Sequence, residues 1–163
     1  MKKEPEPKLQ PVNADTQIPN LTVVEAGYGK GSLNDLSKKN GLVLSFIHGT
    51  WCPACVQQLV RSNKFAADLA AYEVAFVAVV NDALSHVNAF KLSSQPPLSF
   101  PLLADDPPQL AKTFGIFDEL NKRPHLAIFY LDTNGKVLSG NLCHNHDCFP
   151  LMRGLIDLIQ ETT

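Results

Sequence analysis

Short runs of apolar residues alternate along this chain with segments whose apolar positions recur every three or four residues. A near-continuous apolar run is typical of a strand covered on both faces, and spacing of three and four is typical of a helix with one buried face. Residues 42–47 and 74–80 have the first pattern, and residues 56–72 have the second. This alternation predicts an α/β fold.

The remaining elements are shorter, and turn residues delimit them. We expect an edge strand at 21–26, a helix at 83–95, an extended run at 100–103, a short helix at 108–114, a hairpin of 126–131 with 136–142, and a final helix at 149–160. The hairpin prediction rests on Asn134-Gly135, because such a pair supplies the positive φ that tight turns need. No repeat or second domain is evident in the sequence.

The beginning of the chain differs from the rest, because its first 19 residues hold four of the twelve prolines and no periodic apolar pattern. We expect residues 1–17 to be a flexible tail or linker, and residues 18–163 to form one domain. Lys2-Lys3 resembles the start of an export signal, but no apolar segment follows it. A cytoplasmic location is therefore expected; a periplasmic or exported protein whose start was trimmed at Met1 would have the same sequence.

Composition excludes several function classes. With 45% hydrophobic and 18% charged residues, the chain can bury a core and is not mainly disordered. A net charge of −2 leaves no electrostatic footprint for nucleic acid. The longest apolar run, residues 74–80, is far shorter than the ~20 residues of a membrane span.

Four cysteines occur as two close pairs, and the first pair lies between a predicted buried strand and a predicted helix. Cys52 then falls at the N-cap and Pro53 at the first helical position, where a missing N–H costs nothing. The free N–H groups of the helix start stabilise a thiolate at Cys52. Cys55, one turn later, is close enough to attack a mixed disulfide on Cys52. We predict Cys52 as the nucleophile and Cys55 as the resolving thiol, with half of a zinc site as the alternative.

The segment FIHGTWCPAC resembles the strand-to-helix motif of the thioredoxin-like superfamily. It is most similar to the peroxiredoxin-like (redoxin, AhpC/TSA-type) branch, which carries F-x-R-G-x-W-C-P-x-C. Three further segments resemble that branch in order: VAVVNDALSHVNAFK, FPLLADDPPQLAKTFGI and FYLDTNGKV. The resemblance covers about residues 17–163. It implies a thioredoxin-like fold with a central mixed β-sheet, a terminal antiparallel hairpin and helices on both faces.

The sequence departs from the family pattern at two points. Typical peroxiredoxins place their reactive cysteine in P-x-x-x-T-x-x-C, but Ser45 and Gly49 occupy the Pro and Thr positions. Thr50, one residue away, could supply a hydroxyl in a shifted register. The branch's arginine is His48 here, which could tune Cys52, shuttle a proton or be a hydrogen-bonded loop histidine. These departures favour thiol–disulfide exchange over peroxide reduction.

The resemblance also implies roles for three further residues. Thioredoxin-like proteins carry a cis-proline beside the CxxC motif, and peroxiredoxins carry an arginine that polarises the peroxide. Pro124 and Arg123 precede the hairpin, but their spacing to Asp132 is about two residues too long, so a trans-proline and a solvated arginine are the alternatives. Trp51 lines the exposed apolar surface around the site in this family, and we expect it to contact a partner.

The second cysteine pair, Cys143 and Cys148, encloses His144 and His146 and is not part of the family motif. The topology of a thioredoxin-like sheet places this loop at the same edge as Cys52. Three interpretations stay open: a disulfide that relays electrons to or from the CPAC pair, a zinc or copper site with the two histidines, or a structural disulfide or two idle thiols. A disulfide closing so short a loop adds only modest stability.

We therefore expect a thiol-disulfide oxidoreductase in which Cys52 attacks a protein disulfide and Cys55 resolves the mixed disulfide. The alternatives are an antioxidant thiol peroxidase that reduces hydrogen peroxide or organic hydroperoxides, and a metal-binding module built on the Cys143–Cys148 loop. The first two need no cofactor and a thioredoxin- or glutathione-type reductant. Redox potential, substrate and oligomeric state do not follow from the sequence.

Overall fold

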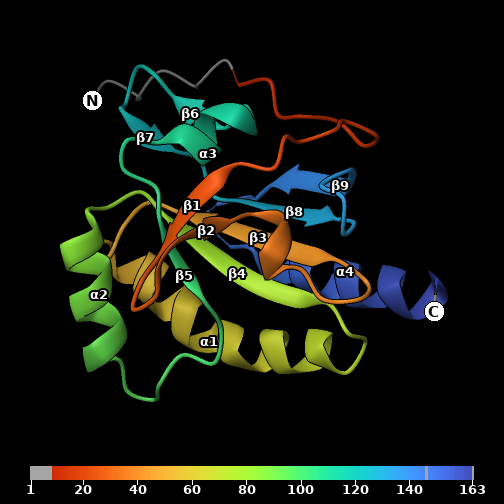
Figure 1. Ribbon diagram of the computed structural model, residues 1–163, viewed down its shortest axis with the longest axis horizontal. Coiled ribbons are helices and arrows are strands. Elements are labelled where there is room, and N and C mark those ends of the chain that lie inside the picture. Colours follow the sequence, from red (N-terminus) through yellow and green to blue (C-terminus); the bar gives the residue numbers. More distant parts are fainter. Residues whose placement is uncertain (1–8, 146, 163) are drawn as a thin grey trace.

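The computed structural model describes residues 9–145 and 147–162, and within them seven strands form one mixed sheet in the order β2-β1-β5-β4-β3-β8-β9 (Figure 1). Its centre is β3 (Leu42–Ile47), which pairs in parallel with β4 (Ala75–Val80) and antiparallel with β8 (Ala127–Leu131). All six residues of β3 and of β4 are buried, as their apolar sequences predict.

The other elements are arranged around this centre. The remaining strands of the sheet are β1 (Thr22–Glu25), β2 (Gly29–Ser32), β5 (Leu102–Ala104) and β9 (Val137–Leu142), and a separate pair is formed by β6 (Phe117–Asp118) and β7 (Arg123–Pro124). The helices are η1 (Asn34–Leu36), α1 (Pro53–Ala70), α2 (Leu84–Ser93), α3 (Gln109–Thr113) and α4 (Phe149–Thr162). Within the described residues, none of these helices is both long and apolar enough to cross a membrane.

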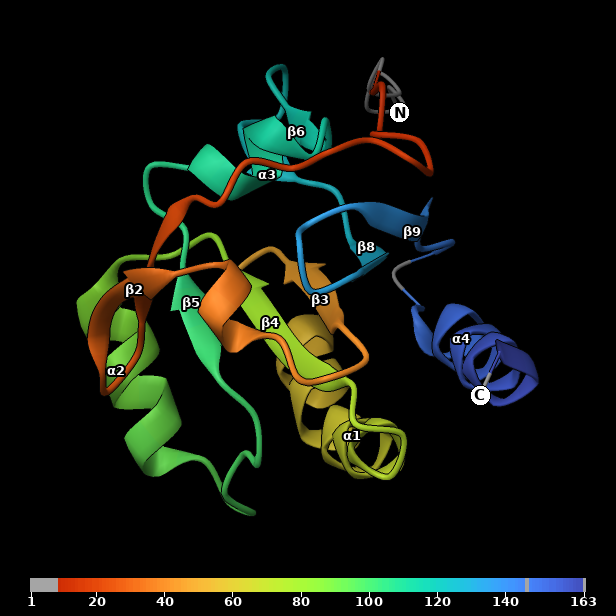
Figure 2. The ribbon, with the colours of Figure 1, turned by 45° about the vertical axis from the view of Figure 1, so that its right-hand side comes forward.

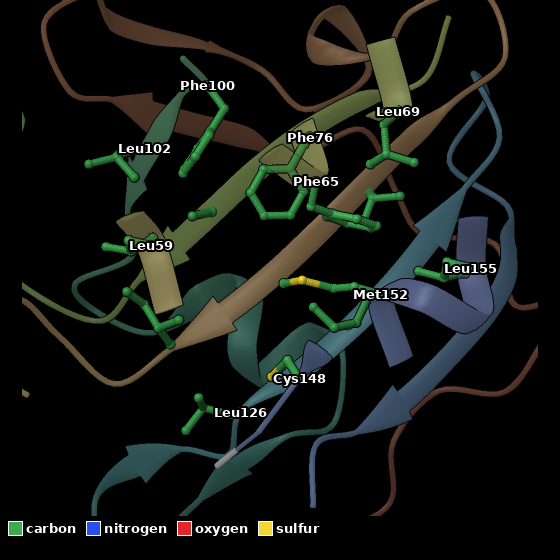
Figure 3. Packing of buried hydrophobic residues seen from close by; sticks show 14 of the residues in the cluster. Leu59, Phe65, Leu69, Phe76, Phe100, Leu102, Leu126, Cys148, Met152 and Leu155 are labelled. Atoms are coloured by element: carbon green, nitrogen blue, oxygen red, sulfur yellow. The ribbon is translucent and has the colours of Figure 1, made fainter. Parts of the chain in front are cut away.

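Helices cover both faces of the sheet, as the family resemblance implies. The ribbon shows α1, α2 and α4 on one side of the sheet and α3 on the other (Figure 2). Val43 and Ile47 of β3 belong to a buried cluster with residues of α1, α2 and α4, whereas Leu44 and Phe46 belong to a second cluster with residues of α3. In the first core, Leu59 of α1 and Met152 of α4 pack on the same side of the sheet (Figure 3). The fold is thus a thioredoxin-like α/β sandwich.

One strand lies elsewhere than predicted. The strand expected at the edge, β1, lies between β2 and β5, and β2 is the edge. β2 has the sequence GKGS, which has no apolar alternation, so the periodicity gives no sign of it. β2 is a strand because its backbone pairs with β1, with Val23 opposite Gly31.

The described part of the expected tail, residues 9–17, lies along the domain. The Val12 N–H donates to the Phe114 carbonyl at 3.1 Å, and the Asp15 N–H donates to the Val137 carbonyl at 2.8 Å. Val12 and Asp15 are thus hydrogen-bonded to the domain that follows them.

The topology brings the two cysteine pairs to one end of the sheet. Ala127 at the start of β8 lies opposite Phe46 near the end of β3, and Leu142 at the end of β9 lies opposite Ala127. The loop after β3 and the loop after β9 consequently emerge at the same edge, which confirms the position expected for the second pair.

Candidate active site

Cys52 begins α1 as predicted. Its carbonyl accepts the Val56 N–H at 3.0 Å, which makes Cys52 the N-cap, and Pro53 is the first residue of the helix. The Cys52 Sγ accepts the N–H of Cys55 at 3.3 Å, so the sulfur occupies the place of a capping oxygen. The half-buried sulfur therefore lies against the free N–H groups and the positive dipole end of an 18-residue helix.

Cys55 lies one turn inside α1 and is fully buried. Burial, and then the hydrogen bond to the Cys52 side chain, raise the pKa of Cys55 from 9.0 to about 12, although the backbone of His48 and Gly49 acts in the opposite direction. At neutral pH Cys55 is consequently a thiol that holds its proton. The two sulfurs thus lie in unequal environments, Cys52 half buried and Cys55 fully buried.

His48 and Trp51 form the wall beside the two sulfurs. Their rings stack with centroids 6.2 Å apart and planes 12° apart, while His48 is buried and Trp51 is 62% exposed. A side chain at Gly49 would overlap the Trp51 indole, so this stacking requires a glycine there. A ring nitrogen of His48 and the sulfurs of Cys52 and Cys55 all lie within 4.8 Å of one another.

Thr50 is hydrogen-bonded to an aspartate that follows β4. Its Oγ1 donates to Asp82 Oδ2 at 2.6 Å, and its N–H donates to the same oxygen at 3.2 Å. The other oxygen of Asp82 accepts the Ala83 N–H and contacts His86 Nδ1, both at 2.8 Å. Desolvation acts to raise the pKa of Asp82, but the hydrogen bonds from Thr50, His86 and Ala83 outweigh it and lower the pKa below its ordinary value.

Pro124 and Arg123 form β7, which pairs with β6 outside the main sheet. Pro124 lies opposite Phe117 in the β6–β7 pair, and the bond before it is trans; the cis bonds of the described chain precede Pro96 and Pro107. The expectation of a cis-proline at Pro124 is therefore wrong. The long spacing to β8 explains it, because the extra residues place Pro124 in a separate ribbon.

Arg123 lies in the same ribbon, opposite Asp118. Its charge is one of the influences that lower the pKa of Asp118, after hydrogen bonds from Asn121 and Leu120 that outweigh desolvation. Leu126, which follows this ribbon, is buried in the same hydrophobic cluster as Cys55.

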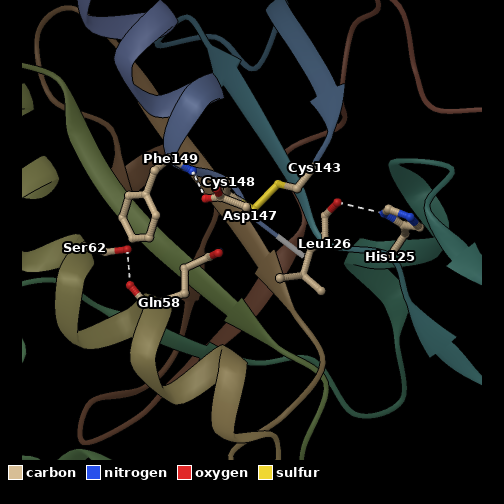
Figure 4. The surroundings of a disulfide bond; sticks show 8 residues. All are labelled: Gln58, Ser62, His125, Leu126, Cys143, Asp147, Cys148 and Phe149. Carbon is tan, nitrogen blue, oxygen red and sulfur yellow. Dashed lines mark hydrogen bonds between the residues drawn. A yellow bond between two sulfur atoms is a disulfide. The ribbon is translucent and has the colours of Figure 1, made fainter. Parts of the chain in front are cut away.

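Cys143 and Cys148 form a disulfide with an S–S distance of 2.00 Å, and both are buried (Figure 4). The Cys143 N–H donates to the Leu126 carbonyl at 2.8 Å, and the Cys148 carbonyl accepts the Met152 N–H at 3.0 Å. Cys148 is therefore the N-cap of α4, and the disulfide ties the start of that helix to the end of β9. Gln58 of α1 lies close to it and has a buried Nε2 with no hydrogen-bond partner.

The metal interpretation of this loop finds no support. A sulfur bonded to another sulfur is not a thiolate ligand, so Cys143 and Cys148 cannot bind zinc or copper in this state. His144 is exposed and takes part in a bridge with Asp147, whereas His146 lies outside the described residues. The metal-ligating atoms that the structure does gather belong to the first pair and His48.

Sequence reasoning missed the residues that orient the loop before Cys52. Asp82 follows a buried strand, a position at the carboxyl edge of the sheet, and this signal could have identified it. Gly49, His86 and Gln58 offer no such signal, because their roles depend on neighbours that only the fold supplies.

Comparison with known proteins agrees with this geometry. Residues 14–139 match the AhpC/TSA family. The chain belongs to this family. A fold of the same kind occurs in peroxidoxin BcpB from Mycobacterium tuberculosis, which is 18% identical over 93% of this chain and 98% of that chain, with a TM-score of 0.79. Peroxiredoxin Q from Xanthomonas campestris is 16% identical over 92% of this chain and 98% of that chain, with a TM-score of 0.75. AhpC from Enterococcus faecalis is 20% identical over 90% of this chain and 91% of that chain, with a TM-score of 0.74. No curated protein sequence matches the chain significantly.

Membership of the AhpC/TSA family, together with the paired cysteines, makes this protein an oxidoreductase that works through thiols. The sequence identities to the solved structures are low, so those structures support only the peroxiredoxin-type fold. Which reaction the protein catalyses has to be argued from the residues of this site.

Proposed function

We propose that this AhpC/TSA-family protein is a thiol peroxidase that reduces a hydroperoxide with Cys52 and is regenerated through Cys55. One observation carries the proposal: the half-buried Cys52 Sγ lies at the start of α1 and accepts the Cys55 N–H at 3.3 Å. A sulfur in that position faces the free N–H groups and the positive dipole end of the helix, and the thiolate is the form of cysteine that attacks a peroxide.

The reaction proceeds in two balanced steps. The Cys52 thiolate attacks one oxygen of the hydroperoxide; an S–O bond forms, the O–O bond breaks, and the alcohol or water leaves after it takes up a proton. Cys55 then attacks the sulfur of the Cys52 sulfenic acid, so that an S–S bond forms and water leaves. One hydroperoxide is reduced to an alcohol and water while one dithiol is oxidised to a disulfide.

The unequal environments of the two cysteines suit this order. A pKa of about 12 keeps the proton on Cys55 while Cys52 reacts, so Cys55 donates a hydrogen bond and does not compete as a nucleophile. Cys55 must lose that proton in the second step. The His48 ring nitrogen, within 4.8 Å of the Cys55 sulfur, is placed to accept it.

An external thiol reductant must reduce the Cys52–Cys55 disulfide before the next cycle, and we assign this role to a thioredoxin-type dithiol or to two molecules of a glutathione-type monothiol. Trp51, 62% exposed beside Cys52, offers the apolar surface on which such a partner would dock. Neither step calls for a metal or an organic cofactor.

A second candidate is direct exchange with protein disulfides, and the Thr50–Asp82 hydrogen bond favours it. Because the Thr50 hydroxyl donates to Asp82 at 2.6 Å, this threonine does not present its hydrogen to a peroxide at Cys52. Disulfide exchange needs only an attacking and a resolving sulfur, and Cys52 and Cys55 provide both.

Stopped-flow fluorescence separates the two candidates. Trp51 is the only tryptophan and adjoins Cys52, so its emission reports oxidation at that sulfur. Reduced protein is mixed with hydrogen peroxide and, separately, with a disulfide substrate; the Cys52→Ser variant is the blank, and a Cys143→Ala/Cys148→Ala variant is the matched control. Oxidation by peroxide far faster than that of a free thiol supports the peroxidase. A rate no better than a free thiol, with a rapid response to the disulfide, overturns it in favour of exchange.

A further inference from the structure

The reduced site gathers three soft metal ligands on rigid backbone. His48 follows the last residue of β3, Cys52 is the N-cap of α1, and Cys55 lies in the first turn of that helix. A ring nitrogen of His48 and the two sulfurs lie within 4.8 Å of one another. We propose that the reduced site binds one thiophilic cation, of which Zn²⁺ is the type, through His48, Cys52 and Cys55.

The spacing is close to what the ion requires. Zinc bonds of about 2.3 Å to sulfur and about 2.0 Å to nitrogen place tetrahedral ligand atoms roughly 3.5–3.8 Å apart. The three atoms here, at most 4.8 Å apart, need to approach by about 1 Å at the widest pair. Rotation of the half-buried Cys52 side chain moves its sulfur without a change in the backbone.

Charge and burial also suit such an ion. Binding releases the proton of each protonated thiol to solvent, and the two resulting thiolates balance the charge of Zn²⁺. Cys55 and His48 are buried, whereas Cys52 is only half buried, so the ion would be held from inside and reached from the Cys52 side. Two thiolates and one imidazole leave a fourth position for water, a ligand set that proteins use for zinc.

The bound ion would occupy the sulfur that performs the proposed chemistry. A Cys52 thiolate coordinated to zinc has its lone pair engaged, and Cys55 is held beside it as a second ligand. The metal-bound form would therefore resist both peroxides and disulfides until the ion is removed. This consequence rests on the proposed function, but binding itself does not and can be measured with no oxidant present.

The other cysteine pair provides the matched control. Cys143 and Cys148 are bonded to each other and lie outside the three-ligand group, so a Cys143→Ala/Cys148→Ala variant keeps every proposed ligand. His144→Ala is a second control, in which an exposed histidine outside the proposed site is removed.

Reduced protein, freed of reductant, is titrated with Zn²⁺ in competition with a chromophoric chelator, and separately with Co²⁺, whose absorption reports thiolate ligation and tetrahedral geometry. We expect one ion per chain in the wild type and in both controls. Cys52→Ser, Cys55→Ser and His48→Ala should each weaken binding by about 100-fold or more, since even the loss of residues that only support a ligand costs 10–100-fold.

The oxidised wild type is a control that does not depend on whether the variants fold. Formation of the Cys52–Cys55 disulfide should abolish binding, and reduction should restore it, with no change of sequence. Binding that survives oxidation or the Cys52→Ser substitution, that disappears in the Cys143→Ala/Cys148→Ala variant, or that is absent from the reduced wild type overturns the inference. A protein that binds zinc but reacts slowly with peroxide refutes only the proposed peroxidase.

Discussion

The hydroxyl of Thr50 donates to Asp82 Oδ2 at 2.6 Å, across 32 residues of sequence. The bond fixes the loop before Cys52 to the connection that follows β4, and it engages the hydroxyl hydrogen as a donor. The conformation of the nucleophile's loop therefore depends on an aspartate in the neighbouring strand connection.

Replacing Asp82 with Asn should loosen this loop. Asp82 accepts four hydrogen bonds as a carboxylate, and bonds to a charged group contribute about 1.5–3 kcal/mol each. We expect Asp82→Asn to lower the free energy of unfolding by roughly 1–3 kcal/mol at pH 7 and to slow the oxidation of Cys52. Urea denaturation and Trp51 stopped-flow fluorescence measure the two effects.

The effect of Asp82 on stability has a defined pH window. Its pKa is lower in the folded protein than the ordinary 3.8, so its contribution is present above pH 3.8 and is lost as pH falls through the folded pKa. The stability difference between wild type and Asp82→Asn should shrink as the pH is lowered below that value. A difference that stays constant from pH 7 to pH 3 would contradict the assignment of the ionised carboxylate as the acceptor.

Cys55 should make the reduced protein sensitive to alkali. Its pKa rises from 9.0 to about 12 on folding, so between these values the unfolded chain has lost a proton that the native state retains. The free energy of unfolding should fall as pH rises through this window, by up to about 1.4 kcal/mol per pH unit.

The matched comparison for this prediction is Cys55→Ala, in which the other groups that titrate at high pH are unchanged. The urea midpoints of the two reduced proteins should converge from pH 8 to pH 11, because the free energy of unfolding of the wild type falls more steeply over this range. Parallel pH profiles would show that Cys55 is not the buried thiol described here.

Removing the Cys143–Cys148 disulfide should cost modest stability. The residues are five apart, and chain entropy predicts about 2 kcal/mol for so short a loop. Cys143→Ala/Cys148→Ala should thus lower the melting temperature by roughly 4–8 °C while the first oxidation of Cys52 by peroxide keeps its rate. If that rate falls along with stability, the second pair takes part in the chemistry, as the relay interpretation predicted.

The sequence determined the parts of this structure that depend on local pattern. The apolar runs of β3 and β4, the helical stripe of α1 and the Asn134-Gly135 turn each leave a periodic or conformational signature in consecutive residues. The position of the CPAC motif between a buried strand and a helix follows from the same signatures, and with it the capping role of Cys52.

Contacts between distant segments were decided only by the tertiary structure. The burial that raises the pKa of Cys55 comes from packing within the core, and Asp82 meets Thr50 because β3 and β4 lie side by side. Arg123 lies opposite Asp118 because β6 and β7 pair with each other outside the main sheet. The periodicity of apolar residues specifies which face of a helix or strand is buried. It carries no information on which polar side chains from distant segments will contact each other, and those contacts set the chemistry of the site.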